Sequence, residues 1–341
     1  MTRLFTALIL SAVISYAMTP FARRAAYRLG AIDVPKDNRR MHLKPIPRLG
    51  GLAIYAAFAA VSLLMMTLDV QMVTLLAGAT LMVGLGMMDD TRPLPAKLKL
   101  AIQIMAALIV IAGGVRIEFI TNFFSAAKTP VYLGPLSIPV TLFWIVGITN
   151  TVNLIDGLDG LAAGVAGIAS LSLAAVAYLN GEPEVAVLLM ILAGSSIGFL
   201  PHNSHPATIF MGDTGSLLIG FVLAAISIEG VIKSATTIAV AIPVLALGVP
   251  IFDTTFAILR RLVNKRPIME ADKGHLHHRL LDRGYSHRQT VWILYAFSFF
   301  LGVSAIFISG ASRTISIASL LLVTLILMMA MIRAGLLKRT G

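Results

Sequence analysis

Long apolar runs, separated by short polar segments, recur along the whole chain. Several of these runs approach or exceed the ~20 residues that a helix needs to cross the hydrocarbon core of a membrane. A membrane-spanning barrel would instead alternate apolar and polar residues. The pattern therefore predicts an all-α polytopic membrane protein of about eleven transmembrane helices, at residues 4–19, 50–68, 71–88, 98–115, 137–154, 160–179, 184–200, 215–230, 236–258, 290–309 and 314–333.

The basic residues orient these helices. If the N-terminus lies outside, the segments on the inner side carry 22 of the 27 Lys and Arg residues. Because Lys and Arg are enriched in cytoplasmic loops, this bias predicts an outer N-terminus and a cytoplasmic C-terminus in the cell membrane. The segment from Arg116 to Pro139 is then outside, and its turn-forming residues predict a small hairpin.

The chain is predicted to form one domain. No short-period repeat and no low-complexity linker divides it, so residues 1–341 are interpreted as a single integral membrane unit. The first apolar run resembles a signal peptide. It lacks a clear small-residue cleavage pattern, however, and further apolar runs follow it, which favours a retained helix.

Composition supports the membrane assignment. The chain is 57% hydrophobic and 13% charged, whereas soluble domains carry about 25% charged residues. A net charge of +11 would suggest nucleic acid in a soluble protein. Here it fits basic loops beside anionic lipid, so we expect a lipid partner and no nucleic acid. The absence of cysteine excludes disulfides and thiol chemistry.

The polar residues that could bind ligands or take part in a reaction fall on the predicted inner side. The central motif among them is Asn153-Leu-Ile-Asp156-Gly-Leu-Asp159-Gly. Residues three apart on a helix share a face, so Asn153, Asp156 and Asp159 are predicted to lie together. Ionised carboxylates near membrane depth are costly without a partner. A hard divalent cation such as Mg²⁺ is the simplest partner for such a cluster of oxygen atoms.

Asp89 and Asp90 end another apolar run. A helix C-terminus repels anions, and adjacent carboxylates raise one another's pKa unless a cation neutralises them. The pair therefore suits a metal site, or a base poised for a phosphate or hydroxyl nucleophile. Carboxylates solvated at the membrane surface are the simpler alternative. Lys97 and Lys99 follow, and snorkelling at the membrane edge would account for them.

Gly212-Asp213-Thr-Gly215 places one acid in a flexible turn before an apolar run. Such a turn can direct backbone N–H groups at a phosphate while the acid holds a metal ion. Alternatively, Asp213 simply caps the helix that follows. Asp253, inside a predicted span, is a functional candidate or the partner of a base such as Arg260.

His275, His277 and His278 lie in the longest inner loop, with Lys273 and Arg279 beside them. A helical His-x-x-x-His pair, a cysteine and a nearby acidic ligand are all missing, so zinc is disfavoured there. A cradle for pyrophosphate and sugar oxygens fits the charges, and a solvated basic loop is the alternative.

Together these motifs suggest metal-assisted phosphoryl transfer between a soluble polyanion and a phosphorylated lipid. The chain has no Gly-x-x-x-x-Gly-Lys-Ser/Thr motif, so an ATP-driven pump is unsupported. A transporter would place its acids near the bilayer midplane, reachable from both sides, and here they lie at inner helix ends. A non-catalytic lipid-binding scaffold would not need these acids beside phosphate-binding loops.

At these motifs the chain resembles the polyprenyl-phosphate N-acetylhexosamine-1-phosphate transferases, glycosyltransferase family 4. It is most similar to the bacterial enzymes that initiate teichoic-acid and O-antigen synthesis. Related muramyl-pentapeptide transferases usually carry three consecutive histidines in the last loop. Leu276 interrupts them here, which favours an N-acetylglucosamine donor. The motifs that carry the resemblance are Arg39-Arg40-Met-His42, Pro47-Arg48-Leu-Gly-Gly51, Asp89-Asp90, Asn150 to Gly160, Phe210-Met-Gly-Asp213-Thr-Gly215 and His275-Leu-His277-His278-Arg279.

The resemblance implies a reaction in which UDP-N-acetylglucosamine and undecaprenyl phosphate give undecaprenyl-diphospho-N-acetylglucosamine and UMP, with Mg²⁺ or Mn²⁺. It implies that Asp213 holds the metal, with Asn153 or Asp90 helping. Asp89 would position the lipid phosphate or act on it as a base, and Lys99 would neutralise phosphate. Direct in-line attack is favoured over a covalent aspartyl-phosphate, which the sequence leaves open.

The resemblance also implies where the substrates bind. Asp159 would face the uracil and Asp156 the nucleotide–metal region, and Arg48, in a family motif of the first inner loop, would also bind substrate. The polyprenyl tail would lie in an apolar groove at the inner leaflet. Another UDP-sugar, such as N-acetylgalactosamine, a diamino sugar or the muramyl pentapeptide, is the alternative donor, and a homodimer is expected from the family. The residues implied to hold pyrophosphate and sugar are His275, His277, His278 and Arg279.

Overall fold

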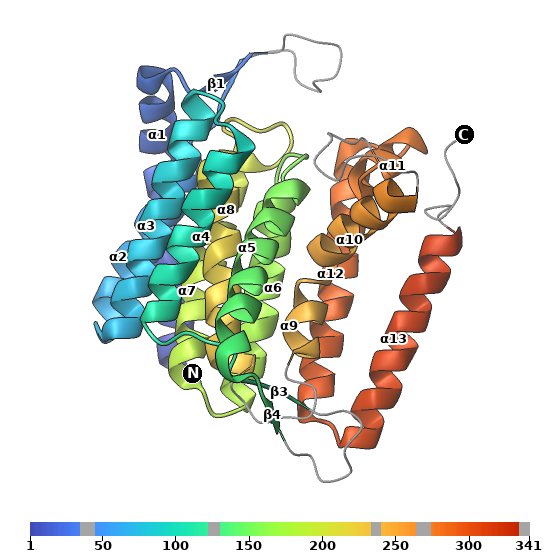
Figure 1. The fold of residues 1–341 in the computed structure, drawn as a ribbon. Helices are drawn as coiled ribbons and strands as arrows, with labels where there is room; N and C mark the ends of the chain where they lie inside the picture. The colour runs from blue at the N-terminus through green and yellow to red at the C-terminus, as the bar shows by residue number, and fades with distance from the viewer. Residues whose placement is uncertain (35–44, 122–129, 233–239, 264–273, 334–341) are drawn as a thin grey trace.

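Helices make up most of the chain in the computed structural model (Figure 1). The structure describes residues 1–34, 45–121, 130–232, 240–263 and 274–333. The motif Arg39-Arg40-Met-His42 and Lys273 lie outside the described residues. The α-helices are α1 (Thr2–Leu29), α2 (Gly51–Met65), α3 (Val70–Thr91), α4 (Ala96–Ala112), α5 (Ser137–Ile155), α6 (Leu161–Leu179), α7 (Pro183–Asn203), α8 (Gly212–Ser227), α9 (Ala241–Ala246), α10 (Gly248–Val263), α11 (Leu276–Asp282), α12 (His287–Gly310) and α13 (Arg313–Arg333).

The strands form two small antiparallel pairs. Strand β1 (Ile32–Asp33) pairs with β2 (Ile46–Pro47), close to the start of α2. Strand β3 (Phe119–Thr121) pairs with β4 (Pro130–Tyr132). The second pair confirms the hairpin that the turn residues between Arg116 and Pro139 predict. A short 3₁₀-helix (Gly134–Leu136) then leads into α5, and a π-helical turn (Ile228–Ile232) follows α8.

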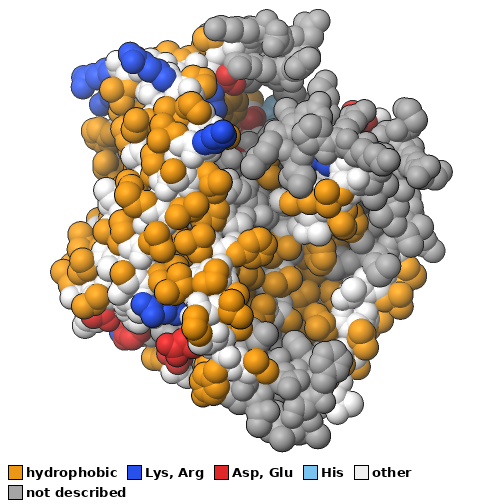
Figure 2. All heavy atoms as spheres, in the orientation of Figure 1, with side chains coloured by type: hydrophobic (Ala, Val, Ile, Leu, Met, Phe, Trp, Pro, Cys, Tyr) orange, Lys and Arg blue, Asp and Glu red, His pale blue; other side chains and the backbone are white. Residues whose placement is uncertain are grey.

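The helices confirm an all-α polytopic membrane fold. Among the described residues, seven helical segments are long and apolar enough to cross a membrane: Thr2–Leu29, Val70–Thr91, Gly134–Ile155, Leu161–Leu179, Pro183–Asn203, Gly212–Gly230 and His287–Gly310. Two shorter apolar helical segments are Gly51–Met65 and Thr314–Leu325. On the face that Figure 2 shows, apolar side chains cover the middle of the described surface, and charged side chains gather toward its two ends.

One predicted span, residues 236–258, is wrong as a continuous helix. Helix α9 ends at Ala246 and α10 begins at Gly248. Pro250 explains the break, because it has no N–H to donate to the carbonyl of Ala246 and its ring clashes with that carbonyl. The apolar run predicted as one span therefore contains two helices, with Leu247 between them.

Helices α1 and α7 approach one another closely through small residues. A Cβ atom on Gly194 would lie 2.2 Å from the carbonyl oxygen of Leu8, and one on Gly198 would lie 2.1 Å from that of Ala12. Two glycines four residues apart let helix backbones meet, which is a common packing mode in membranes. At the opposite end from the candidate site, Arg3 of α1 forms an ion pair with Glu184 of α7.

The ends of several helices meet at the upper end of the bundle in Figure 1. There the end of α3 lies near the starts of α4 and α8, and α10 and α11 lie at the same end. The first residue of the chain lies at the opposite end. The described candidate residues on these elements therefore come from one end of the molecule.

Candidate active site

Helix α8 is buried along its whole length except at Asp213. Its first turn is pressed against α2 and α3. A Cβ atom on Gly51 would lie 2.1 Å from the backbone nitrogen of Gly215, and one on Gly86 would lie 2.3 Å from that of Thr214. These glycines allow a backbone approach that no larger residue permits. The helix therefore presents one carboxylate at the end of an otherwise buried element.

Asp90, at the end of α3, caps the start of α8. Its side chain is 0% exposed. One carboxylate oxygen accepts a hydrogen bond from the backbone N–H of Asp213 at 3.0 Å; the other accepts from the N–H of Thr214 at 3.0 Å and from its hydroxyl at 2.7 Å. A carboxylate suits these unpaired N–H groups and the positive end of the helix dipole. Asp90 thus fixes the position of Asp213.

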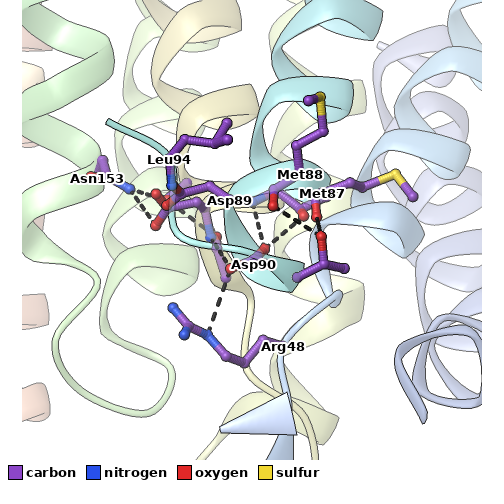
Figure 3. Close-up of polar contacts among 12 residues, drawn as sticks. Arg48, Met87, Met88, Asp89, Asp90, Leu94 and Asn153 are labelled. Carbon is purple, nitrogen blue, oxygen red and sulfur yellow. Dashed lines mark hydrogen bonds and ion pairs between the residues drawn. The ribbon is translucent and has the colours of Figure 1, made fainter. Parts of the chain in front are cut away.

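Arg48 reaches the same carboxylate from the segment before α2. Its Nε lies 3.6 Å from Oδ1 of Asp90. Figure 3 shows Arg48 approaching Asp90 from one side, while Asn153 and Leu94 lie on the side of Asp89. Arg48 therefore balances the charge of a buried capping residue, and about a third of its own side chain remains exposed.

Asp89 and Asp213 share a single lysine. The Nζ of Lys99 lies 3.0 Å from Oδ2 of Asp89 and 3.3 Å from Oδ2 of Asp213. Asp89 also accepts a hydrogen bond from the backbone N–H of Leu94 at 2.7 Å, and Asn153 donates to Oδ1 of Asp213 at 3.0 Å. Helices α3, α4, α5 and α8 thus bring together Asp89, Lys99, Asn153 and Asp213. The structure therefore brings these four predicted site residues together.

Asp156 follows the last residue of α5 and adds a fourth carboxyl group to this cluster. Its removal from water, together with the charges of Asp213 and Asp90, raises the pKa of the Asp156 carboxyl to about 8. Arg48 opposes it. With Asp89, four carboxyl groups face one lysine and one arginine, so the site lacks the positive charge that all four would need in order to ionise. Hard oxygen ligands and this charge deficit fit a divalent cation such as Mg²⁺.

Asp159 lies apart from Asn153, contrary to the shared helical face that the spacing predicts. The reason is that α5 ends at Ile155 and the chain then turns through Gly157 and Gly160, whose φ of 78° is left-handed. The turn directs Asp159 to His205, whose Nδ1 lies 2.8 Å from Oδ2, and to the backbone N–H of Ala207 at 3.1 Å.

Asp253 and His275 organise the histidine loop. His275 Nδ1 lies 2.8 Å from Oδ2 of Asp253, and the backbone N–H of Leu276 donates to Oδ1 at 2.7 Å. Asp253 therefore pairs with a base, as one alternative predicts, and it also caps α11. Arg279 donates from Nε to the carbonyl of Gly274 at 3.1 Å, which stabilises the start of this loop.

His277 joins this loop to the acidic cluster. It packs against the turn after α5, because a Cβ atom on Gly157 would lie 2.4 Å from its Nε2. Burial and, to a smaller extent, the neighbouring His278 lower the pKa of His277 to about 4, so His277 is neutral at pH 7. The ring centroids of His277 and His278 are 4.3 Å apart.

Sequence reasoning missed two parts of the site. Gln103 of α4 and Asn150 of α5 exchange side-chain hydrogen bonds of 2.7 and 3.3 Å. Gln103 lies one turn after Lys99, and a polar residue in an apolar run is the signal that would have found it. Ser216 was also missed, and its hydroxyl accepts a hydrogen bond from Asn153 at 2.8 Å.

An acidic cluster with one lysine, held by the ends of packed apolar helices, defines a polytopic membrane enzyme with a polar site at one end of its bundle. The model of the family described as Glycosyl transferase family 4 matches residues 72–231. That match contains the cluster acids, Lys99 and Asn153; Arg48 and the histidine loop lie outside it. The chain belongs to this family of polyprenyl-phosphate N-acetylhexosamine-1-phosphate transferases, as its motifs predict.

Individual relatives support the same assignment. The probable undecaprenyl-phosphate N-acetylglucosaminyl 1-phosphate transferase of Bacillus subtilis (strain 168) is 41% identical over 318 residues, 93% of this chain and 88% of that protein. The decaprenyl-phosphate N-acetylglucosaminephosphotransferase of Mycobacterium tuberculosis (strain ATCC 25618 / H37Rv) is 35% identical, and the match covers 84% of this chain and 77% of that protein. The undecaprenyl-phosphate alpha-N-acetylglucosaminyl 1-phosphate transferase of Escherichia coli (strain K12) is 24% identical, and the match covers 79% of this chain and 74% of that protein.

Proposed function

We propose that this enzyme transfers N-acetylglucosamine-1-phosphate from UDP-N-acetylglucosamine to undecaprenyl phosphate, giving undecaprenyl-diphospho-N-acetylglucosamine and UMP. The observation that carries the proposal is the cluster in which Lys99 bridges Asp89 and Asp213 at the end of an apolar bundle. The names of the relatives from Bacillus subtilis and Mycobacterium tuberculosis specify N-acetylglucosamine and a polyprenyl phosphate. The product would start a cell-envelope glycopolymer, such as a teichoic acid or an O-antigen.

A divalent cation, Mg²⁺ or Mn²⁺, would be held by Asp213 with help from Asp89 and the amide oxygen of Asn153. When bound, such an ion neutralises charge on the donor diphosphate and on the departing UMP. Asp90 contributes by positioning Asp213, since both of its oxygens already accept hydrogen bonds from the start of α8.

Lys99 and Asp89 would receive the lipid phosphate. The second pKa of a phosphate monoester is about 6, so this nucleophile is already largely ionised at pH 7. Asp89 therefore acts mainly by orienting Lys99, which offsets the repulsion between two phosphate groups. An oxygen of the lipid phosphate forms a bond to the sugar-linked phosphorus, and the bond from that phosphorus to the UMP oxygen breaks. The Lys99 ammonium can approach both groups.

The histidine loop would hold the sugar and pyrophosphate of the donor. His277, neutral at pH 7, presents a hydrogen-bonding ring beside the turn that carries Asp156. His275 is oriented by Asp253, and His278 and Arg279 follow on the same short helix. Asp156 would then lie on the nucleotide side of the site, between this loop and the acidic cluster.

In the proposed orientation the enzyme has eleven spans, an outer N-terminus and a cytoplasmic site in the cell membrane. The inner segments of that arrangement contain 22 of the 27 Lys and Arg residues. A cytoplasmic site matches a soluble nucleotide-sugar donor, and an apolar groove between helices would hold the lipid tail. A homodimer stays a prediction from the family.

The test of the donor uses purified protein in detergent with undecaprenyl phosphate and Mg²⁺, and measures UMP release from a panel of UDP-sugars. UDP-N-acetylglucosamine should give UMP only when both lipid and Mg²⁺ are present. Release only from an N-acetylgalactosamine, diamino-sugar or muramyl-pentapeptide donor would replace the proposed substrate. No release from any donor by folded protein would refute the transferase proposal.

A further inference from the structure

A second group of metal-ligating side chains lies outside the acidic cluster. Asp159, His205 and His287 come from the turn after α5, the segment after α7 and the start of α12. Their ligand atoms all lie within 4.8 Å of one another, and this is the one such group of three or more among the described residues. From this geometry we propose that Asp159, His205 and His287 form a binding site for a divalent transition-metal ion such as Zn²⁺.

Two imidazoles and one carboxylate favour a metal ion of intermediate softness, such as Zn²⁺, over Mg²⁺. Imidazole nitrogen suits Zn²⁺, whereas Mg²⁺ prefers oxygen ligands. Zn–N and Zn–O bonds are about 2.0–2.2 Å long, which places tetrahedral ligands about 3.4 Å apart. Oδ2 of Asp159 and Nδ1 of His205 are 2.8 Å apart, a hydrogen-bond distance, so these two atoms would separate by about 0.6 Å around an ion. If the His287 ring turned toward them, the three side chains would supply three ligands and leave a fourth position for water.

His287 carries an independent sign of a missing ligand. Its Nε2 is buried and has no hydrogen-bond partner in the described part of the chain. Leaving such an atom unsatisfied costs about 1–3 kcal/mol, so buried polar groups normally find a partner. The hydrogen bond between Asp159 and His205 alone would explain those two residues, but it leaves the His287 nitrogen unexplained. A metal ion would use its lone pair.

The two histidine rings are already arranged side by side. The rings of His205 and His287 are stacked with centroids 4.2 Å apart and an interplanar angle of 21°. Two protonated imidazoles at this distance would repel one another, so the stacking favours neutral rings, each of which offers a nitrogen lone pair. One ring would turn out of the stack for both nitrogens to reach the same ion. The side chain of His205 is 38% exposed and that of Asp159 is 15% exposed, so an ion can reach the group from solvent.

The backbone around these residues is held by cross-links between the same three segments. The hydroxyl of Tyr295 in α12 donates to the carbonyl of Gly160 at 2.5 Å, and Arg288 donates to the carbonyl of His205 at 3.2 Å. Asn203 accepts from the N–H of Gly160 at 3.0 Å. Such supporting contacts orient metal ligands. A bound ion would clamp together three segments that lie beside the candidate active site.

The test uses the full chain in detergent, stripped with EDTA and titrated with Zn²⁺ alone. One equivalent should bind and raise the unfolding temperature, and Co²⁺ in its place should give the strong visible absorption of four-coordinate geometry. His205→Gln and His287→Gln should each weaken Zn²⁺ binding by more than the about 10–100-fold that loss of a supporting group costs. Chromatography and thermal unfolding show that the variants are folded.

Two controls separate this site from its neighbours. His278→Gln should keep the Zn²⁺ affinity, because His278 lies in the other histidine loop. Asp213→Asn should also keep it while weakening Mg²⁺ binding, so the result does not depend on transferase activity. The proposal is overturned by an absence of saturable Zn²⁺ binding, or by binding that persists in the His205→Gln, His287→Gln double variant.

Discussion

Lys99 is the residue on which the acidic cluster depends most directly, because its ammonium contacts both Asp89 and Asp213. The exposed Lys97 lies two residues earlier on the same helix and provides a matched control for charge. Both lysines are candidates from the sequence, and snorkelling explains Lys97 equally well. The structure separates them, because α4 turns Lys99 toward α3 and α8.

Lys99→Gln should reduce lipid-dependent UMP release by about 10²–10³-fold, as removal of a group that stabilises developing charge does elsewhere. Lys97→Gln should leave the rate within about twofold, since exposed charges contribute little. Initial rates at saturating donor and lipid measure both changes. Equal losses in the two variants would contradict the role of Lys99.

The raised pKa of Asp156 predicts that Mg²⁺ binding depends on pH. Without a metal ion its carboxyl holds a proton below about pH 8. A cation binds the ionised form, so Mg²⁺ affinity should rise between pH 6.5 and 8.5, and binding should release a proton. Calorimetry in two buffers of different ionisation enthalpy measures both effects. Asp156→Asn should flatten this dependence. Mg²⁺ binding that does not vary with pH in the unmodified protein would contradict it.

At the scale of elements, the start of α8 is the feature that builds the site. Asp90 reaches it from a helix more than a hundred residues earlier in the chain, and Gly86 lets the two backbones meet. The sequence predicts an acid before an apolar helix at Asp213 and an acidic pair at Asp89 and Asp90. It does not predict that Asp90 caps that helix, because the contact depends on tertiary packing.

Gly86→Ala should displace α8 and with it Asp213. The added Cβ would meet backbone atoms of Thr214 at 2.3 Å, which cannot move independently. The unfolding temperature and the transfer rate should both fall. Gly84→Ala is the matched control, since a Cβ there meets nothing within 4 Å and alanine favours a helix by about 0.5–1 kcal/mol. A Gly86→Ala protein as stable and active as Gly84→Ala would contradict this packing account.

At the scale of the whole molecule, the apolar runs predict most of the helices, because membrane spans need length and hydropathy that are visible locally. The break between α9 and α10 was missed although Pro250 marks it, since apolar composition continues through it. The partner of Asp159 was missed because the turn through Gly157 and Gly160 ends the helical periodicity on which that prediction rested. His205 and His287 are far apart in sequence and have no shared motif.

The orientation of the molecule can be tested by labelling, because the chain contains no cysteine. Lys97→Cys lies at the end that holds the site, and Glu182→Cys lies in the turn before α7, and both positions are exposed. A membrane-impermeant thiol reagent is applied to cells whose inner membrane is intact and whose outer surface the reagent can reach. It should label Glu182→Cys alone. Lys97→Cys should react only after the membrane is opened. The reverse pattern would contradict the proposed cytoplasmic site.

The most direct test of the central claim is the lipid product itself. Purified enzyme, undecaprenyl phosphate, Mg²⁺ and UDP-N-acetylglucosamine should give undecaprenyl-diphospho-N-acetylglucosamine, identified by mass spectrometry, with one UMP for each lipid formed. Folded Asp213→Asn protein should form almost none. UMP release without this lipid, or undiminished product from Asp213→Asn, would contradict the claim that the acidic cluster carries out phosphoryl transfer to a polyprenyl phosphate.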